Sequence, residues 1–151
     1  MDDVEVRRLD EGASLGDAFD VRIAVFVEGQ DVAEDLEMDG EDEDARHVVA
    51  YDGDEPIGTA RLRSPEPEIA KIERVAVRDA YRDRGVGRVL MAAIEDVARE
   101  EGHVAAVLHA QTRVEAFYRK LGYETVSDVF EEAGIPHVEM AKPLGSGNWT
   151  C

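Results

Sequence analysis

Cysteine is almost absent from this chain of 151 residues, since the one cysteine, Cys151, is the last residue. A single thiol builds no disulfide framework and no cysteine-type metal cluster. No apolar run reaches the roughly 18 residues that a membrane helix needs. The acidic start, Met1 to Glu5, is unlike a signal peptide, which is basic and then apolar. We therefore expect a cytoplasmic protein that holds no metal and does not bind membranes.

Lysine is scarce as well: the chain has three lysines among 17 basic residues, against 35 acidic residues, and a net charge of −18. Such a charge repels nucleic acid and anionic membranes. Its self-repulsion largely disappears in molar salt, where the screening length falls to about 3 Å. We therefore expect a halophile's protein; an ordinary acidic mesophilic protein is the alternative.

The apolar fraction of 44% and the length predict one domain, residues 1–144, followed by a loose polar tail, residues 145–151. Hydrophobic periodicity predicts the order β-α-β-β-β-α-β-α-β-β, which favours a mixed α+β sheet over a doubly wound parallel fold. The clearest element is a long helix from Val86 to Gly102, and Pro65 and Pro67 are expected to break the chain. The predicted strands are 4–9, 47–51, 57–62, 69–77, 104–110, 123–126 and 137–140, and the shorter helices are 14–27 and 114–121.

A glycine-rich segment, Arg82-Asp83-Arg84-Gly85-Val86-Gly87-Arg88, joins strand 69–77 to the long helix. The glycines let the backbone approach a ligand, and a helix N-terminus offers unpaired N–H groups to an anion. Residues 78–88 hold four arginines and two aspartates, a local charge of +2 within an acidic chain. Position 90 is leucine and no Lys-Ser/Thr follows, which argues against a dinucleotide fingerprint and a P-loop. The segment is therefore either a phosphate-binding loop or a tight strand-to-helix turn.

A second motif lies about thirty residues downstream, where residues 116–123 read Ala-Phe-Tyr-Arg-Lys-Leu-Gly-Tyr. The two motifs together resemble those of the GNAT N-acetyltransferase superfamily. Segments 25–30, 37–39, 45–47, 58–62, 109–111 and 130–137 also resemble its ElaA-like branch. The resemblance implies a GNAT-type twisted mixed sheet of about six to seven strands with flanking helices. Its two central strands, ending near Val77 and starting near Val104, would splay apart.

The resemblance also implies acetyl-CoA as co-substrate. The pantetheine arm would lie in the splay and pair with the backbone of Val75, Ala76 and Val77, and the pyrophosphate would lie on the N–H groups of residues 84–88. Gln111 stands where many relatives have an asparagine that contacts the cofactor. The implied cofactor-binding set is Val75, Ala76, Val77, Arg82, Arg84, Gly85, Val86, Gly87, Arg88, Gln111 and Phe117.

Acylation of an amine needs a base for the amine, and a proton helps the thiolate to leave. The second motif implies that Tyr118 is this acid; a core aromatic is the alternative. Glu73 lies four residues before Val77, so we expect both side chains on one face of the strand, with a raised pKa for a half-buried Glu73. A salt bridge to an arginine is the alternative for Glu73. His137 and His109 are rival bases because imidazole titrates near neutral pH.

We therefore expect direct acetyl transfer to a small-molecule or peptide amine in a ternary complex, because no internal cysteine is available as a nucleophile. A non-catalytic acyl-CoA-binding module is the alternative. Glu131 and Glu132 beside the predicted turn 134–136 would attract a cationic substrate. The acidic run that begins at Asp35 opens like an EF-hand loop, but Arg46 replaces its bidentate glutamate, so we expect no calcium site. A homodimer is common among proteins that resemble this one.

Overall fold

The computed structural model describes residues 4–9, 16–28, 45–82 and 84–144. The predicted helix start at residue 14, the acidic run and the tail 145–151 lie outside these residues. The elements are β1 (Val4–Leu9), α1 (Gly16–Arg22), the π-helix η1 (Ile23–Glu28), β2 (Arg46–Asp52), β3 (Glu55–Glu66), β4 (Ile69–Val77), the 3-10 turn η2 (Asp79–Tyr81), α3 (Val86–Glu100), β5 (Ala105–Gln111), the 3-10 turn η3 (Thr112–Val114), α4 (Glu115–Lys120), β6 (Glu124–Thr125), β7 (Phe130–Glu132) and β8 (Ile135–Pro143).

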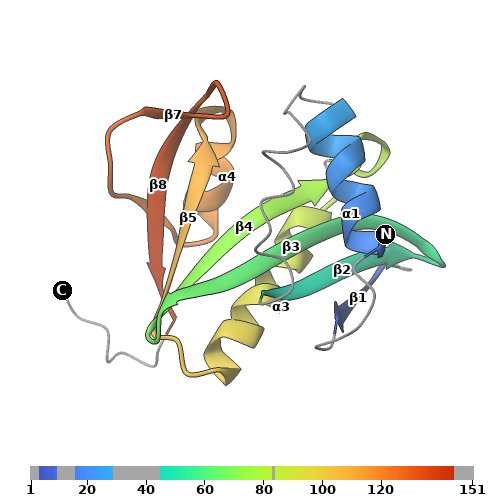
Figure 1. The fold of residues 1–151 in the computed structure, drawn as a ribbon, viewed down its shortest axis with the longest axis horizontal. Coiled ribbons are helices and arrows are strands. Elements are labelled where there is room, and N and C mark those ends of the chain that lie inside the picture. The colour runs from blue at the N-terminus through green and yellow to red at the C-terminus, as the bar shows by residue number, and fades with distance from the viewer. Residues whose placement is uncertain (1–3, 10–15, 29–44, 83, 145–151) are drawn as a thin grey trace.

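The strands form one twisted mixed sheet in the order β1-β2-β3-β4-β5-β8-β6, and β7 pairs with β8 (Figure 1). Neighbouring strands are antiparallel except β4 and β5, which are parallel. The helices α3 and α4 pack on one face, and α1 crosses the other face over β2, β3 and β4. The α+β prediction is confirmed. The sheet has eight strands, one more than the upper predicted number.

The main core lies between the sheet and α3, whose periodic apolar residues turn toward the strands. Leu90, Ile94 and Ala98 are fully buried there. The approach is close at Gly58 of β3, where an added Cβ would lie 2.8 Å from Cδ1 of Leu90. Burial of this apolar stripe, rather than helix propensity alone, stabilises α3 against the sheet.

The two central strands diverge along their length. Their pairing runs from Ile69 opposite Ala105 to Ile72 opposite Leu108 and goes no further. Beyond it, β4 continues beside β3 and β5 continues beside β8 (Figure 1). The inner edges of residues 73–77 and 109–111 therefore face each other without a shared ladder, as the predicted splay requires.

A β-bulge in β4 changes which side chains face the core. Between the pairs Thr59–Ala76 and Arg61–Glu73, β3 advances two residues while β4 advances three, and Arg74 has a positive φ of 55°. Ile72 packs in the core under α3, whereas Ala76 packs with residues of α1 and η1 on the other face. An extra residue inverts the alternation of a strand. The prediction that Glu73 and Val77 share a face is therefore wrong.

Two other predictions also need correction. Pro65 lies inside β3, where β2 no longer pairs because their register ends at Arg46 opposite Leu62, so a missing N–H is tolerated. The turn predicted at residues 134–136 lies instead at Ala133 and Gly134, both with positive φ, and joins β7 to β8. None of the helices in the described ranges is long and apolar enough to span a membrane.

Candidate active site

A cavity of about 920 Å³ runs between the diverging strands, from the N-terminus of α3 to the β7–β8 hairpin. Its volume is in the range of small-molecule and cofactor sites. Every residue of the predicted cofactor-binding set except Arg84 lines it, as do the predicted catalytic residues Glu73, Tyr118 and His137, although the predictions came from four separate stretches of chain. These residues are Glu73, Val75, Ala76, Val77, Arg82, Gly85, Val86, Gly87, Arg88, Gln111, Phe117, Tyr118 and His137.

The glycine-rich segment brings the first turn of α3 to the cavity. Gly85 is the N-cap residue with φ 82°, a left-handed conformation that glycine adopts without strain. It brings no side-chain oxygen to the amides of the first turn, so these N–H groups can bind an anion. Gly87 has a different role, because an added Cβ would lie 3.2 Å from Cζ of Phe117. Its lack of a side chain lets α4 approach α3.

Arginines surround this end of the cavity. Arg82 lies 2.7 Å from Asp79 and donates from Nε to the carbonyl of Val77. Arg84 lies over the ring of Tyr81, 5.6 Å from its centroid, rather than on the cavity wall. Arg113, which was not among the predicted residues, also lines the cavity and donates from Nε to Oε1 of Gln111 at 2.8 Å. Its place just after β5, at the mouth of the splay, is the signal that could have identified it.

Tyr118 lies on α4 with its ring edge-on to Phe117 and Tyr123. The residue is 8% exposed, and burial raises the pKa of its phenol. Its hydroxyl has no hydrogen-bond partner within the described part of the chain. The hydroxyl oxygen itself is not fully buried. The hydroxyl therefore stays protonated at neutral pH and is able to donate into the cavity.

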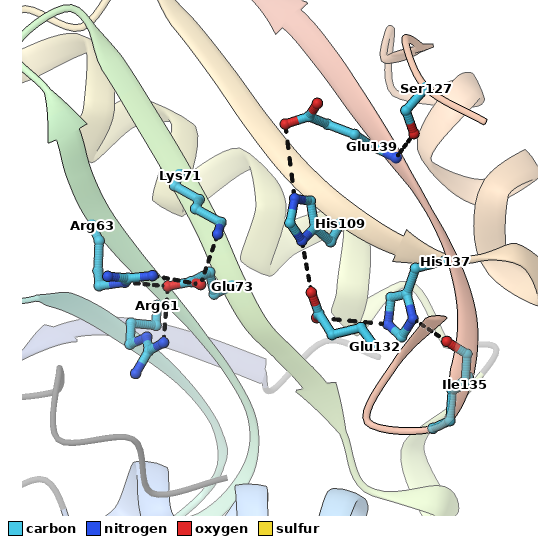
Figure 2. A network of polar contacts seen from close by, with 10 residues as sticks. All are labelled: Arg61, Arg63, Lys71, Glu73, His109, Ser127, Glu132, Ile135, His137 and Glu139. Atoms are coloured by element: carbon cyan, nitrogen blue, oxygen red, sulfur yellow. Dashed lines mark hydrogen bonds and ion pairs between the residues drawn. The ribbon is translucent and has the colours of Figure 1, made fainter. Parts of the chain in front are cut away.

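Glu73 is the centre of an ion-pair cluster (Figure 2). Its Oε1 accepts from Nη2 of Arg61 at 2.8 Å, and Arg63 binds both carboxylate oxygens, at 2.5 and 2.9 Å. Nζ of Lys71 lies 3.5 Å from Oε2. Burial raises the pKa of Glu73, but the Arg63 hydrogen bond and the three positive charges outweigh it and lower the pKa to about 2. The expectation of a raised pKa is therefore wrong, and the salt-bridge alternative is what the structure has.

A second polar cluster lies across the divergence, on β5, β7 and β8 (Figure 2). Nδ1 of His109 donates to Oε1 of Glu132 at 2.8 Å, and Nδ1 of His137 donates to the carbonyl of Ile135 at 2.6 Å. The His109 hydrogen bond lowers the pKa of Glu132. Phe130 contacts both imidazoles, edge-on to His109 and stacked on His137. His109, Glu132 and His137 all line the cavity.

The comparisons with known proteins agree with this geometry. The family model described as "Acetyltransferase (GNAT) domain" matches residues 14–144. The chain belongs to the GNAT acetyltransferase family. Its relatives include the uncharacterised N-acetyltransferase YjcF of Bacillus subtilis, 41% identical over 85% of this chain and 91% of the relative, and Protein ElaA of Escherichia coli, 33% identical over 82% of this chain and 84% of the relative. The resemblance to ElaA is thereby confirmed.

Solved structures of GNAT proteins have the same fold. The crystal structure of Escherichia coli ElaA superposes with a TM-score of 0.81 at 30% identity, over 92% of this chain and 99% of ElaA. A GNAT acetyltransferase of Elizabethkingia anophelis with acetyl-CoA bound superposes with a TM-score of 0.74 at 16% identity, over 95% and 99% of the two chains. Within the described ranges of our GNAT chain, no group of three or more His, Cys, Asp and Glu residues could hold a metal ion.

Proposed function

We propose that this GNAT protein transfers an acetyl group from acetyl-CoA to an amine, directly, in a ternary complex. One observation carries the proposal: a single cavity connects the glycine-capped N-terminus of α3 with the phenol of Tyr118 and the imidazole of His137. An anion-binding end and a proton-transfer end joined in this way match the two halves of the reaction.

The residues that we propose to bind the cofactor lie in three parts of this cavity. The N–H groups at the start of α3, with Arg82 and Arg88, would hold the pyrophosphate of acetyl-CoA. The inner edge of residues 75–77, which no longer pairs with β5, would hydrogen-bond the pantetheine arm. Phe117 and Gln111 line the neighbouring walls. The GNAT structure with acetyl-CoA bound has the same fold, which supports this choice of co-substrate.

His137 is the base in this proposal, and Tyr118 is the acid. The acceptor ammonium loses a proton to the imidazole, and the free amine then attacks the thioester carbonyl. The N–C bond forms, the C–S bond breaks, and the thiolate takes a proton from Tyr118. The phenolate regains a proton from the acylated nitrogen, so the reaction releases one proton overall. Glu73 does not act as the base, because its oxygens are bound by Arg61 and Arg63.

The composition is our ground for proposing a salt-rich setting for the reaction. The net charge of −18 suits a salt-rich cytoplasm, and it disfavours nucleic acid as a partner. A small-molecule or peptide amine is the expected acceptor, and a homodimer is common among proteins that resemble this one. Assays in concentrated KCl are therefore the appropriate starting condition.

Two measurements test the proposal. Calorimetry in concentrated KCl should show binding of acetyl-CoA, and thiol release should then appear with at least one amine from a panel of polyamines, amino acids, aminoglycosides and peptides. The absence of any binding heat would overturn the proposed function. Binding without turnover on any amine would instead support a non-catalytic acyl-CoA-binding module.

A further inference from the structure

The Nε2 atom of His137 is an unused acceptor. The carbonyl of Ile135 can only accept, so Nδ1 of His137 carries the proton, and Nε2 of the neutral ring carries a lone pair. The side chain is 8% exposed but lines the cavity. Oε2 of Glu132 lies 3.9 Å from Nε2, too far for a hydrogen bond. No other partner of Nε2 is present among the residues that the structure describes.

Glu132 is held so that one of its oxygens stays available. His109 binds Oε1, and Oε2 is turned toward His137 (Figure 2). Oε2 and Nε2 are then two acceptors 3.9 Å apart, and no residue in the described ranges places a donor between them. A primary ammonium group carries three N–H donors and can bond to both. Phe130 packs against both imidazoles and fixes the geometry.

The charges around this pair indicate what else the acceptor carries. Glu132 lines this part of the cavity, whereas Glu139 lies at the other nitrogen of His109, with its Oε2 3.8 Å from Nε2, and the exposed Glu131 is not part of the cavity lining. The charge of Lys71 also reaches Glu132, although its amine lies 3.5 Å from Glu73, and Arg74 and Arg113 line the same cavity. A carboxylate on the carbon that carries the reacting nitrogen would lie close to the Glu132 carboxylate and be repelled by it.

We propose that Glu132 binds the acceptor's ammonium group beside Nε2 of His137, that His109 positions Glu132, and that the enzyme prefers cationic amines with no carboxylate on the amine-bearing carbon. This inference rests on the proposed acetyl transfer. One N–H bond of the ammonium breaks, its electron pair stays on nitrogen, and the proton moves to Nε2. The resulting imidazolium faces the Glu132 carboxylate, which stabilises it.

The substrate preference is tested with pairs that differ by one carboxylate: 2-phenylethylamine and phenylalanine, histamine and histidine, agmatine and arginine. Phenylalaninamide controls for size without the charge. We expect kcat/KM to be at least about tenfold higher for the carboxylate-free member of a pair, since repulsion of about 1.4 kcal/mol has this effect. Equal or better turnover of the amino acids, or no turnover of any of the three amines, would overturn the inference.

The residue roles are tested on the best of these amines. Glu132→Gln should raise the KM for the amine about tenfold or more, with the KM for acetyl-CoA unchanged, while Glu131→Gln, on the exposed neighbour, should change neither. His109→Asn keeps a donor in place of Nδ1 and should retain the KM for the amine, whereas His109→Phe should raise it. An unchanged KM in Glu132→Gln, or equal effects of the two His109 variants, would overturn the inference and leave acetyl transfer itself intact.

Discussion

Two carboxylates line the cavity on opposite sides of the strand divergence, and they differ in how completely their oxygens are occupied. Both oxygens of Glu73 are bound by cations, and its side chain is 12% exposed. Glu132 uses one oxygen for His109 and is 47% exposed. Both pKa values are lowered, so the pKa does not separate them. On this difference in occupied oxygens we propose a structural role for Glu73 and a ligand-binding role for Glu132.

The neighbouring tyrosines show the same contrast. The hydroxyl of Tyr123 donates to Oε2 of the buried Glu95 at 2.8 Å. Tyr118 packs 5.9 Å away, ring to ring, but its hydroxyl lacks such a partner in the described part of the chain. A phenol already bonded to a carboxylate has no proton to spare for a thiolate. Tyr118 is therefore the better candidate for the acid.

The largest expected effect is at His137, which lies in the cluster with Glu132. His137→Ala should lower kcat roughly 10³-fold, because a positioned base contributes about 10²–10⁴-fold. Affinity for acetyl-CoA should stay unchanged, and added imidazole should restore part of the activity. Steady-state kinetics and calorimetry measure the two quantities. A kcat within threefold of the unsubstituted protein would exclude His137 as the base.

Glu73, whose two carboxylate oxygens are both bound by cations, should affect stability instead. Glu73→Gln removes the carboxylate that Arg63 and the fully buried Arg61 both bind, and should lower the free energy of unfolding by about 3 kcal/mol. The kcat per folded molecule should change little. Glu66→Gln, on the exposed end of β3, is the matched control and should be neutral. A large loss of kcat at unchanged stability would reverse the assignment of the two glutamates.

The tyrosine pair predicts a smaller effect on rate. Tyr118→Phe should lower kcat about 30-fold, or about 2 kcal/mol, and leave the Kd for acetyl-CoA nearly unchanged. Tyr123→Phe should lower stability by about 1 kcal/mol and leave kcat unchanged, because it removes a buried hydrogen bond. Thiol release and thermal unfolding of both variants separate these outcomes. Equal loss of kcat and acetyl-CoA affinity in Tyr118→Phe would rule out the acid role.

The sequence predicts those features that depend on local pattern. The apolar periodicity of α3 and the glycine spacing before it located the glycine-capped helix N-terminus that lines the cavity, and the family resemblance of the second motif pointed to Tyr118, which also lines it. The bulge in β4 has no such signal, because neither glycine nor proline marks it and Arg74 itself adopts the positive φ. That one residue turned Glu73 to the opposite face from Val77 and into the arginine cluster.

The second cluster was predictable in its members but not in its contacts. Glu132 and His137 stand five positions apart, and the three-residue strand β7 is too short to give a periodic signal. Their meeting with His109 depends on the register that places Gln111 opposite His137 and Phe130 opposite His137 on either side of β8. Such long-range register is set by the whole sheet rather than by any local stretch.

The smallest expected effect is the pH dependence of the stability that the Glu73 ion-pair cluster contributes. The pKa of Glu73 is lowered from 4.5 to about 2 on folding, so its contribution to stability is complete above about pH 4.5 and is lost as the pH falls toward 2. The stability difference between the unsubstituted protein and Glu73→Gln should therefore shrink by about 1 kcal/mol between about pH 6 and about pH 4. Denaturant unfolding at high salt across this range measures it. A difference that grew on acidification would mean that Glu73 binds its proton more tightly in the folded state, as a group poised to act as a base would.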